Sequence, residues 1–377
     1  MKSLLRDYIL SHPDTWEKDL AAAPYHLKIT RGDEDLIIFK YNQLESDFSN
    51  PIVREARGII FDERNWMCVC RGFDKFGNYG ESYVPDLDWG NCFVSEKIDG
   101  SLIKMYYYRG SWKIATNGTI DAYDAKIGDA KEDSYGSLFQ KTFYGKVPPN
   151  LFKRIFTDIH MTYLFELVSP VTQVVVPWEE PDVYFLGGCD MTNGKILNFT
   201  HPWFSEIRHL LSTPDIYYMN TLESIQEAAD ALSWDAEGYV VCDSKGNRCK
   251  IKSPAYVRAH YLRANNYVNL SHLLDVINAN EVEEFLIYAP EYADVIKKLK
   301  NYKEILPIWA EMYKNTILNS QFANKFECYL IVKQLNINKE LQNFMLKVYD
   351  YPDYTWEQYT EKWDYARWRR CLAFYFV

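Results

Sequence analysis

The chain has 377 residues, of which 47% are hydrophobic and 25% charged, as is ordinary for a globular protein with a large core and room for two domains. Its net charge of −10 excludes attraction of nucleic acid by the molecule as a whole, so such binding requires a local basic site. The eight cysteines and seven histidines show no ligand spacing, and no apolar run reaches the roughly 20 residues of a membrane span, so we expect a cytoplasmic protein with free thiols.

The first 253 residues alternate short apolar runs with turn sequences such as Thr192-Asn193-Gly194, a pattern that predicts consecutive β-hairpins. Occasional helical patterns favour an antiparallel α+β domain over alternating βαβ units. The predicted strands are 36–41, 57–62, 66–71, 102–108, 112–116, 163–168, 174–176, 183–187, 239–242 and 248–252. The predicted helices of this part are 2–10, 149–159, 202–211 and 221–232.

After Pro254 the turn signals disappear and segments of helical length follow. The last of them begins with Thr355-Trp356-Glu357-Gln358, a capping-box pattern. The predicted helices are 255–265, 270–279, 289–304, 321–335, 338–348 and 355–370. We therefore expect two domains, an antiparallel α+β domain at 1–253 and an all-helical domain at 254–377.

Residues 96–101 read Glu-Lys-Ile-Asp-Gly-Ser and follow an apolar run that looks like the end of a strand. A lysine two residues before an Asp-Gly pair is typical of enzymes that store a nucleotide on the lysine amine. Because side chains at i and i+2 of a strand share a face, we expect Lys97 and Asp99 to point into one pocket, with Gly100 allowing close backbone approach. A lysine attacks only as the neutral amine, so burial or nearby positive charge must favour that form.

Lys250 and Lys252 are a candidate source of that charge. They stand at i and i+2 of a predicted strand, with Ile251 facing the other side. Such a pair suits polyphosphate oxygens and would favour the neutral form of Lys97. An exposed edge strand that carries lysines against aggregation has the same pattern, so both interpretations stay open.

Two carboxylates accompany predicted strands. Glu237 and Gly238 directly precede one strand, an arrangement that suits metal or ribose binding but is also common in turns. Glu166 alternates with the apolar residues Phe165 and Leu167 inside another strand. Its side chain therefore faces either a binding site or solvent.

Two further segments combine cationic and aromatic residues. Arg57 stands before Gly58 and a strand, where a guanidinium can bind a phosphate or ribose, or pair with an acid. Lys75, Phe76 and Asn78 follow the next strand. The lysine can meet a phosphate and the ring can stack on a base.

In this order, the segments resemble one family. The residues 46–61, 75–78, 97–101, 165–170, 237–240 and 250–253 are similar to the motifs of ATP-dependent RNA ligases of the T-even phage type. These ligases form the RNA ligase 1 branch of the covalent nucleotidyltransferase superfamily, which also includes DNA ligases and mRNA capping enzymes. The chain length and the helical C-terminal part also resemble that branch.

The resemblance implies a nucleotidyltransferase domain that performs three successive transfers. Lys97 would attack the α-phosphate of ATP and keep AMP on its amine. The AMP would pass to a 5′-phosphate RNA end, and a 3′-hydroxyl would then seal the strand and release AMP. Magnesium, with manganese as a substitute, fits a reaction that depends on charge neutralisation and alignment.

The resemblance also implies residue roles. The catalytic residues would be Lys97, Asp99, Gly100, Lys250 and Lys252. The nucleotide would be bound by Arg57, Lys75, Phe76, Glu96, Lys97, Glu166, Lys250 and Lys252, and the metal by Glu166 and Glu237.

Three positions differ from the family's pattern. Phe76 is followed by Gly77 rather than by a second aromatic residue, and Asn117 stands where a basic residue is common. The pair Thr172-Gln173 replaces an Asn-Arg pair. One phosphate or RNA contact is then absent or comes from elsewhere in the chain.

The expected partner is RNA with 5′-phosphate and 3′-hydroxyl ends, for example a nicked tRNA, bound by a monomer in the cytoplasm, or in the host cytoplasm if the protein is phage-encoded. Candidate RNA contacts are Asn78, Lys297, Lys298, Arg369 and Arg370, although basic runs on helices are also typical of a solvated face. Two alternative functions stay open. One is a non-catalytic RNA-end binding protein on the same scaffold. The other is a capping-type or DNA-ligase-type transferase, which would need a β-rich OB-fold domain after residue 252.

Overall fold

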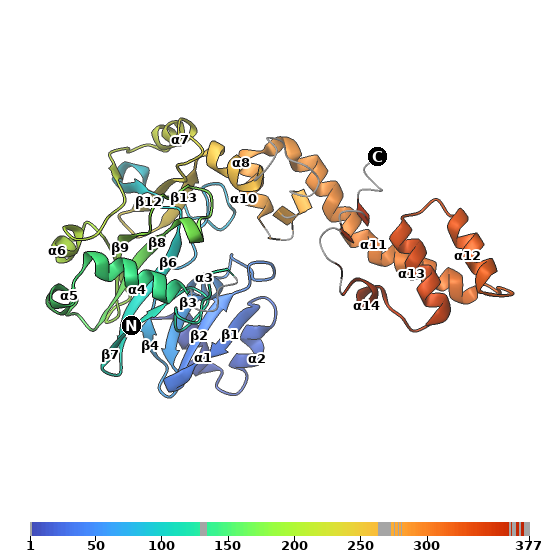
Figure 1. The fold of residues 1–377 in the computed structure, drawn as a ribbon, viewed down its shortest axis with the longest axis horizontal. Coiled ribbons are helices and arrows are strands. Elements are labelled where there is room, and N and C mark those ends of the chain that lie inside the picture. The colour runs from blue at the N-terminus through green and yellow to red at the C-terminus, as the bar shows by residue number, and fades with distance from the viewer. Residues whose placement is uncertain are drawn as a thin grey trace. The chain divides into compact units, whose positions relative to one another are not determined.

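The structure is a computed structural model, and it describes residues 2–128, 134–262, 273, 274, 276, 277, 279, 281–361, 363, 367, 368, 371 and 372. The chain divides into two compact units, Met1–His260 and Tyr261–Val377, coloured blue to yellow and orange to red in Figure 1. The division falls within the residue range of helix α8 (Pro254–Leu262), a few residues after the boundary that the sequence suggested at residue 253.

The first sheet of the first unit is antiparallel, with the strand order β1-β2-β3-β4. Its residues alternate between two cores: Phe39 and Phe61 pack against the N-terminal helices, whereas Ile38 and Ile60 pack against the neighbouring central sheet. The strands are β1 (Leu27–Arg31), β2 (Leu36–Tyr41), β3 (Arg57–Asp62) and β4 (Met67–Cys70), and the helices are α1 (Leu4–Ser11), α2 (Trp16–Ala21) and α3 (Pro51–Glu55).

The central sheet has the order β10-β9-β8-β6-β7 and is also antiparallel. One face buries a cluster of aromatic rings that includes Phe139, Phe143, Phe165 and Phe185. The strands are β6 (Ser101–Tyr108), β7 (Ser111–Ala115), β8 (Met161–Val168), β9 (Asp182–Asp190) and β10 (Lys195–Asn198), and the helices that contribute to this core are α4 (Tyr135–Lys146), α5 (Pro149–Ile155) and α6 (Ser205–Arg208).

The third sheet has the order β11-β5-β12-β13. Helix α7 (Leu222–Asp230) packs on one face of it through Ile225, which shares a core with Val241 and Ile251. Because side chains alternate along a strand, Lys250 and Lys252 lie on the opposite face. The strands are β5 (Cys92–Glu96), β11 (Ile216–Tyr217), β12 (Gly238–Asp243) and β13 (Arg248–Lys252), and short 3₁₀ helices lie at Asp33–Asp35, Trp89–Asn91, Pro170–Thr172, Pro202–Phe204 and Pro290–Tyr292.

The predicted strands at 36–41, 57–62 and 248–252 are confirmed without a shift. The strand predicted at 174–176 is wrong, because the amides of Val175 and Val176 donate hydrogen bonds to a side-chain carboxylate instead of a neighbouring strand. Helix α4 was not predicted from the sequence. Its sequence contains two glycines, and its helical state depends on burying aromatic rings in the central core.

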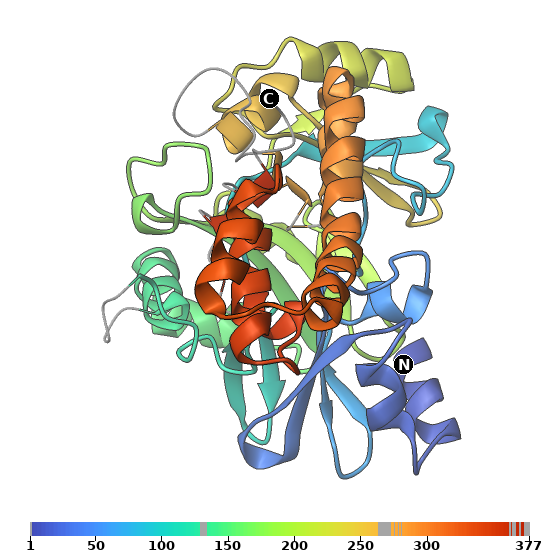
Figure 2. The ribbon, with the colours of Figure 1, turned by 90° about the vertical axis from the view of Figure 1, so that its right-hand side faces the viewer.

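The described residues of the second unit form helices and no strand. Helix α11 runs to residue 319 although the pattern predicted an end near 304, and Pro307 lies inside it. The capping box predicted at Thr355 and Gln358 is present. In Figure 2, α11 is the long orange helix, and it packs with α13 and α14 around Leu306 and Phe344. The helices are α10 (Val282–Tyr288), α11 (Ala293–Asn319), α12 (Lys325–Gln334), α13 (Lys339–Asp350) and α14 (Trp356–Thr360).

The expected fold class, an antiparallel α+β part followed by helices, is therefore confirmed. All eight cysteines are free thiols, also as expected. In the part of the chain that the structure describes, no helix has both the length and the apolar character that a membrane crossing requires.

Candidate active site

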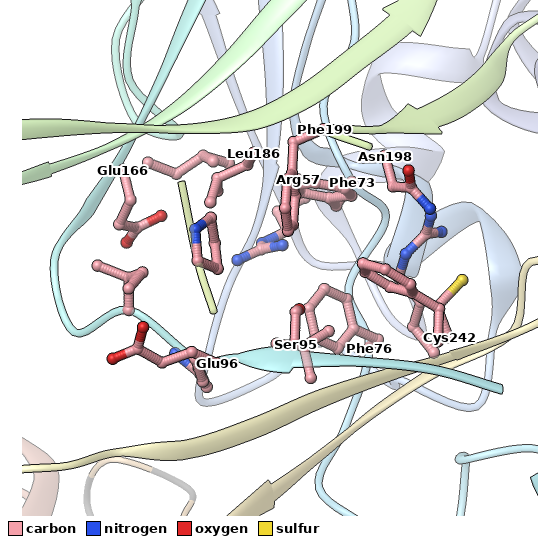
Figure 3. A pocket seen from close by; sticks show the side chains of 17 residues that line it. Arg57, Phe73, Phe76, Ser95, Glu96, Glu166, Leu186, Asn198, Phe199 and Cys242 are labelled. Atoms are coloured by element: carbon pink, nitrogen blue, oxygen red, sulfur yellow. The ribbon is translucent and has the colours of Figure 1, made fainter. Parts of the chain in front are cut away.

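A cavity in the first unit is walled by residues of all three sheets (Figure 3). Arg57 comes from the first sheet, Glu166 and Leu186 from the central sheet, and Glu96 and Val240 from the third sheet. Lys97 lines the same cavity. The remaining lining residues are Phe73, Phe76, Phe93, Ser95, Ile98, Leu102, Asn198, Phe199, Pro214, Cys242 and Arg248.

Lys97 is the first residue after strand β5, and its side chain is paired with Glu237. The Nζ atom of Lys97 lies 2.7 Å from Oε2 of Glu237, although 140 residues separate them in the chain. The backbone amide of Lys97 also donates to the carbonyl oxygen of Gly238 at 2.8 Å. The pairing of β5 with β12, in which Glu96 lies opposite Tyr239, brings these residues together.

Glu237 is bound by a second lysine. Its Oε1 atom lies 3.5 Å from Nζ of Lys252, so one carboxylate with 5% exposure joins Lys97 to Lys252. Gly238 has φ +133°, and a Cβ atom there would collide with the carbonyl oxygen of Ile251 on β13. This position therefore requires glycine, and it lets β12 and β13 approach closely enough for Glu237 to reach Lys252.

Strand β13 presents Lys250 and Lys252 on the side away from α7. Val240, which lies opposite Lys250 in the β12–β13 pair, lines the cavity. The outer side of β13 is partly covered, because Lys250 donates its amide to the carbonyl oxygen of Gly77 and accepts a bond from the amide of Tyr79. The interpretation as an exposed, solvated edge strand therefore does not describe this segment.

Glu166 points into the cavity from β8, while its neighbours Phe165 and Leu167 are fully buried in the central core. Burial raises the pKa of the Glu166 carboxyl to about 7, and the positive charges of Lys97 and Arg57 oppose that increase. A carboxyl of this kind is half protonated near neutral pH and can both donate and accept hydrogen bonds.

Glu96 lies at the same end of the cavity as Glu166 in Figure 3. Burial also raises the pKa of Glu96, and a hydrogen bond from the backbone amide of Asp215 opposes the increase. Both side chains therefore place acidic oxygens in the cavity that Lys97 lines, where hydroxyl or amino groups of a ligand could be bound.

Arg57 stands at the start of β3, with its guanidinium 5.6 Å from the ring centroid of Phe76. The next residue, Gly58, has φ +74°, and its carbonyl oxygen accepts a hydrogen bond from Nζ of Lys104. Lys104 is fully buried, and desolvation lowers its pKa. Sequence reasoning missed Lys104, because a lysine in an apolar strand is ordinarily assigned to the solvent side.

Asp99 was expected to point into one pocket with Lys97, but it does not line the cavity. Strand β5 ends at Glu96, so the alternation of a strand does not apply to these two residues. The Asp99 carboxylate is 4% exposed and accepts hydrogen bonds from the amides of Val175 and Val176 and from the hydroxyl of Tyr256. Asp99 thus holds the loop after β8 and the start of α8 against the Lys97 segment.

Gly100 is required by a close approach, as expected, but its neighbour is protein. A Cβ atom at this position would lie 2.6 Å from the carbonyl oxygen of Leu167 and 3.0 Å from Cγ of Glu166. Gly100 therefore lets β6 begin directly against β8, which sets the Lys97 segment beside Glu166.

The predicted RNA contact at Asn78 is wrong, because Asn78 is fully buried and its amide donates to Glu81 at 2.6 Å. Lys75 lies outside the cavity of Lys97, in an adjoining cleft, with Nζ 4.6 Å from the ring centroid of Phe48 and 5.3 Å from that of Tyr41.

In the second unit, Lys297 and Lys298 are exposed on α11. Arg369 and Arg370 lie outside the described residues. These four positions remain predictions.

The apolar part of the cavity wall had no signal in the sequence. Phe93 of β5 and Phe199 after β10 are in edge-to-face contact, with ring centroids 5.7 Å apart. Leu186 and Leu102 complete a wall that suits a flat ring such as a nucleobase. These residues look like ordinary core positions until the sheets are assembled.

Known proteins with similar sequences include RNA ligases. The sequence profile of an RNA ligase family, of the T4 RNA ligase 1 type, matches residues 55–256. An RNA ligase of Rhodothermus phage RM378 is 25% identical over 93% of this chain and 91% of its own length. A protein of Autographa californica nuclear polyhedrosis virus, provisionally named a bifunctional polynucleotide kinase/RNA ligase, is 29% identical over 85% of this chain. That match covers 45% of the viral protein, so this chain spans less than half of its length.

Similar solved structures include a mutant RNA ligase of Naegleria gruberi with ATP and Mn, at 16% identity and a TM-score of 0.36. That alignment covers 46% of this chain and 52% of the Naegleria chain. A protein of Aquifex aeolicus, provisionally named an ATP-dependent DNA ligase, has 12% identity and a TM-score of 0.48, with 78% of this chain and 75% of the Aquifex chain covered.

Proposed function

Since this chain belongs to the RNA ligase family of the T4 RNA ligase 1 type, whose profile matches residues 55–256, we propose that it joins RNA ends at the expense of ATP, with Lys97 as the residue that carries AMP. The observation that carries this proposal is the position of Lys97. Its amine lines a cavity and is held by Glu237, which also binds Lys252.

In the first step, the neutral amine of Lys97 attacks the α-phosphorus of ATP. A nitrogen–phosphorus bond forms, the bond from phosphorus to the bridging oxygen breaks, and pyrophosphate leaves with the electron pair. The amine must lose a proton, and the Glu237 carboxylate at 2.7 Å is placed to hold it. Lys252 shares that carboxylate and supplies a positive charge near the leaving phosphates.

The cavity suits the rest of the nucleotide. The wall of Phe93, Phe199 and Leu186 can cover the base, and the acidic side chains of Glu96 and Glu166 can bind amino or hydroxyl groups. Arg57, which is stacked on Phe76, can bind a phosphate through its guanidinium fork.

A divalent metal fits this site only together with the phosphates. In the described part of the chain, no group of three or more His, Cys, Asp or Glu side chains could hold a metal by itself. Glu166 lines the cavity and would hold the ion, and Glu237 would join it once Lys97 and Lys252 turn to the nucleotide, since Mg²⁺ is commonly held by one or two carboxylates and substrate phosphates. Bound there, the ion would neutralise charge on the phosphates during transfer.

In the second and third steps, the reacting groups are RNA ends. A 5′-phosphate oxygen attacks the phosphorus of lysyl-AMP, which forms a pyrophosphate linkage and releases the Lys97 amine. A 3′-hydroxyl then attacks the RNA 5′-phosphate, which forms the phosphodiester and releases AMP. We propose a nicked tRNA as the RNA to test first, in a repair function.

The experiment is incubation of wild type and Lys97→Ala with Mg²⁺ and α-labelled ATP or GTP, followed by denaturing electrophoresis. Enzyme already adenylated during expression is first treated with pyrophosphate. We expect a labelled band with ATP alone, absent in the variant, whose label is released as sealed RNA forms. Label from GTP would favour capping chemistry. That chemistry would need a β-rich OB-fold domain, whereas the described residues of the second unit are helical. A blank lane for wild type would favour the non-catalytic RNA-end binding protein.

A further inference from the structure

A second cleft adjoins the cavity of Lys97. The two share Phe73, Phe76 and Arg248 in their walls. The rest of its lining comes from Arg54 on helix α3, from the segment around residues 71–85, and from the β9–β10 and β12–β13 hairpins.

This cleft is basic although the chain is acidic. Four cationic side chains line it, Arg54, Arg71, Lys75 and Arg248, against the single carboxylate of Asp74. The net charge of the whole chain is −10, so the concentration of cations in one cleft runs against the overall composition. A cleft with one sign of charge focuses the field and raises the local concentration of anions.

The cations differ in how they are held. Arg71 forms ion pairs with Glu55 and Asp74 at 2.8 and 2.9 Å, so its charge is largely balanced. Lys75 lies over the rings of Tyr41 and Phe48. The cations of Lys75, Arg54 and Arg248 therefore decide the charge of the cleft.

The direct contacts of these three cations are with neutral groups, while the carboxylate of Asp47 acts on Arg54 from a greater distance. The guanidinium of Arg248 lies 5.3 Å from the ring centroid of Phe73. Arg54 donates from Nη1 to the carbonyl oxygens of Phe48 and Ser49 at 2.7 and 2.8 Å. Aromatic faces and carbonyl oxygens fix the direction of a cation without removing its charge. The cleft is thus preorganised to accept anionic groups.

Phe73 and Phe76 form the boundary between the two hollows, with ring centroids 6.3 Å apart in an edge-to-face arrangement. Arg57 stacks on Phe76 from the cavity, and Arg248 stacks on Phe73. A row of cations beside aromatic rings is the usual composition of a groove for a single nucleic-acid strand, in which phosphates meet the cations and bases stack on the rings.

We propose that the cleft of Arg54, Lys75 and Arg248 binds backbone phosphates of the RNA strand whose 5′ end reacts at Lys97. The inference rests on the proposed function, because it takes the RNA end to the cavity of Lys97. The strand then continues past Phe76 and Phe73, and its next phosphates lie against these three side chains.

The test uses Arg54→Gln in the full chain, since Arg54 lines the cleft and not the cavity. Binding of a 5′-phosphorylated, single-stranded RNA is measured by fluorescence anisotropy over a range of salt concentrations, and lysyl-AMP formation is measured separately. Arg54→Lys keeps the positive charge but lacks the guanidinium group, so it tests whether the shape of that group, apart from its charge, contributes to RNA affinity. Arg154→Gln removes an arginine that is exposed on α5 and serves as the matched control.

We expect Arg54→Gln to weaken RNA binding about tenfold, and to reduce the slope of log affinity against log salt by about 0.7, the value for one lost phosphate contact on a single strand. Arg54→Lys should restore most of the affinity, and Arg154→Gln should match wild type. Lysyl-AMP formation should be unchanged in Arg54→Gln.

Wild-type RNA affinity and salt slope in Arg54→Gln would overturn the inference and leave the proposed function intact. A higher KM for ATP with unchanged RNA binding would also overturn it, because the phosphates in the cleft would then be those of ATP. A wild-type protein that forms no lysyl-AMP would contradict the proposed function instead, while the binding titration would still report on the cleft.

Discussion

The Nζ atom of Lys97 lies 2.7 Å from the Oε2 atom of Glu237, and the other oxygen of that carboxylate lies 3.5 Å from Nζ of Lys252. A lysine in an ion pair with a carboxylate is a poor nucleophile. The pairing of Glu237 with two lysines places a proton acceptor next to the amine, and it makes that acceptor sensitive to any ligand that attracts Lys252.

The change Glu237→Gln keeps the shape of the side chain and removes the charge that Lys97 and Lys252 share. Because the acceptor for the Lys97 proton is lost, we expect the rate of lysyl-AMP formation to fall by about 100-fold or more. The measurement is incorporation of α-labelled ATP into protein that has been stripped with pyrophosphate. Glu180→Gln, on an exposed loop, is the control, and equal rates for the two variants would contradict a role for Glu237.

The change Asp99→Ala should destabilise the fold rather than act on chemistry alone. It leaves the amides of Val175 and Val176 and the hydroxyl of Tyr256 without their acceptor in a buried place. We expect the free energy of unfolding to fall by about 3 kcal/mol, because each buried donor left unsatisfied costs about 1–3 kcal/mol. Tyr256→Phe removes one of these bonds and should cost about 1 kcal/mol. Urea unfolding followed by tryptophan fluorescence gives both values, and an Asp99→Ala value near zero would show that the bonds contribute nothing.

The carboxyl of Glu166 should make stability depend on pH. Its pKa is raised by burial to about 7 from an ordinary value of 4.5, so between these two values the folded state binds more protons than the unfolded state. The free energy of unfolding is therefore expected to fall as the pH rises through this window. The contribution of Glu166 is fully present below pH ~4.5 and lost above pH ~7, and it amounts to at most about 3 kcal/mol.

The variant Glu166→Gln isolates this effect, since Glu96, whose pKa burial also raises, is present in both proteins. Urea unfolding at several pH values should show that wild type loses stability relative to the variant as the pH rises. Parallel curves for the two proteins would mean that the Glu166 pKa is not raised in the folded state.

The change Lys104→Met tests a positioning residue behind the cavity. The buried amino group of Lys104 donates to the carbonyl oxygen of Gly58, which follows Arg57. Methionine fills a similar volume, and volume-conserving replacements are usually tolerated in a core. We expect the KM for ATP in lysyl-AMP formation to rise several-fold while the rate at saturating ATP is retained, because Arg57 loses its fixed direction. An unchanged KM together with reduced stability would assign Lys104 a purely structural role.

Several parts of the fold and site could be predicted because their signals are local. The strands at 57–62 and 248–252 follow from apolar alternation and flanking turns, and each is present in the structure. The side of β13 that carries Lys252 follows from the same alternation, with Ile251 in the core as expected. In contrast, α4 was missed because its helical state depends on burying Phe139 and Phe143 against a sheet whose strands lie elsewhere in the sequence.

The sequence by itself determined the candidate residues for the chemistry, since the segment Glu96–Ser101 and the pair Glu237-Gly238 stand in one order with the other motifs. Only the tertiary structure decided what each residue touches. The pairing of β5 with β12 brings Lys97 to Glu237 across 140 residues. Other tertiary contacts bury Asp99 against Val175 and Tyr256, and Lys75 lies in a separate basic cleft. Strand pairing over such distances depends on the sum of many buried contacts, and no local pattern in a chain records that sum.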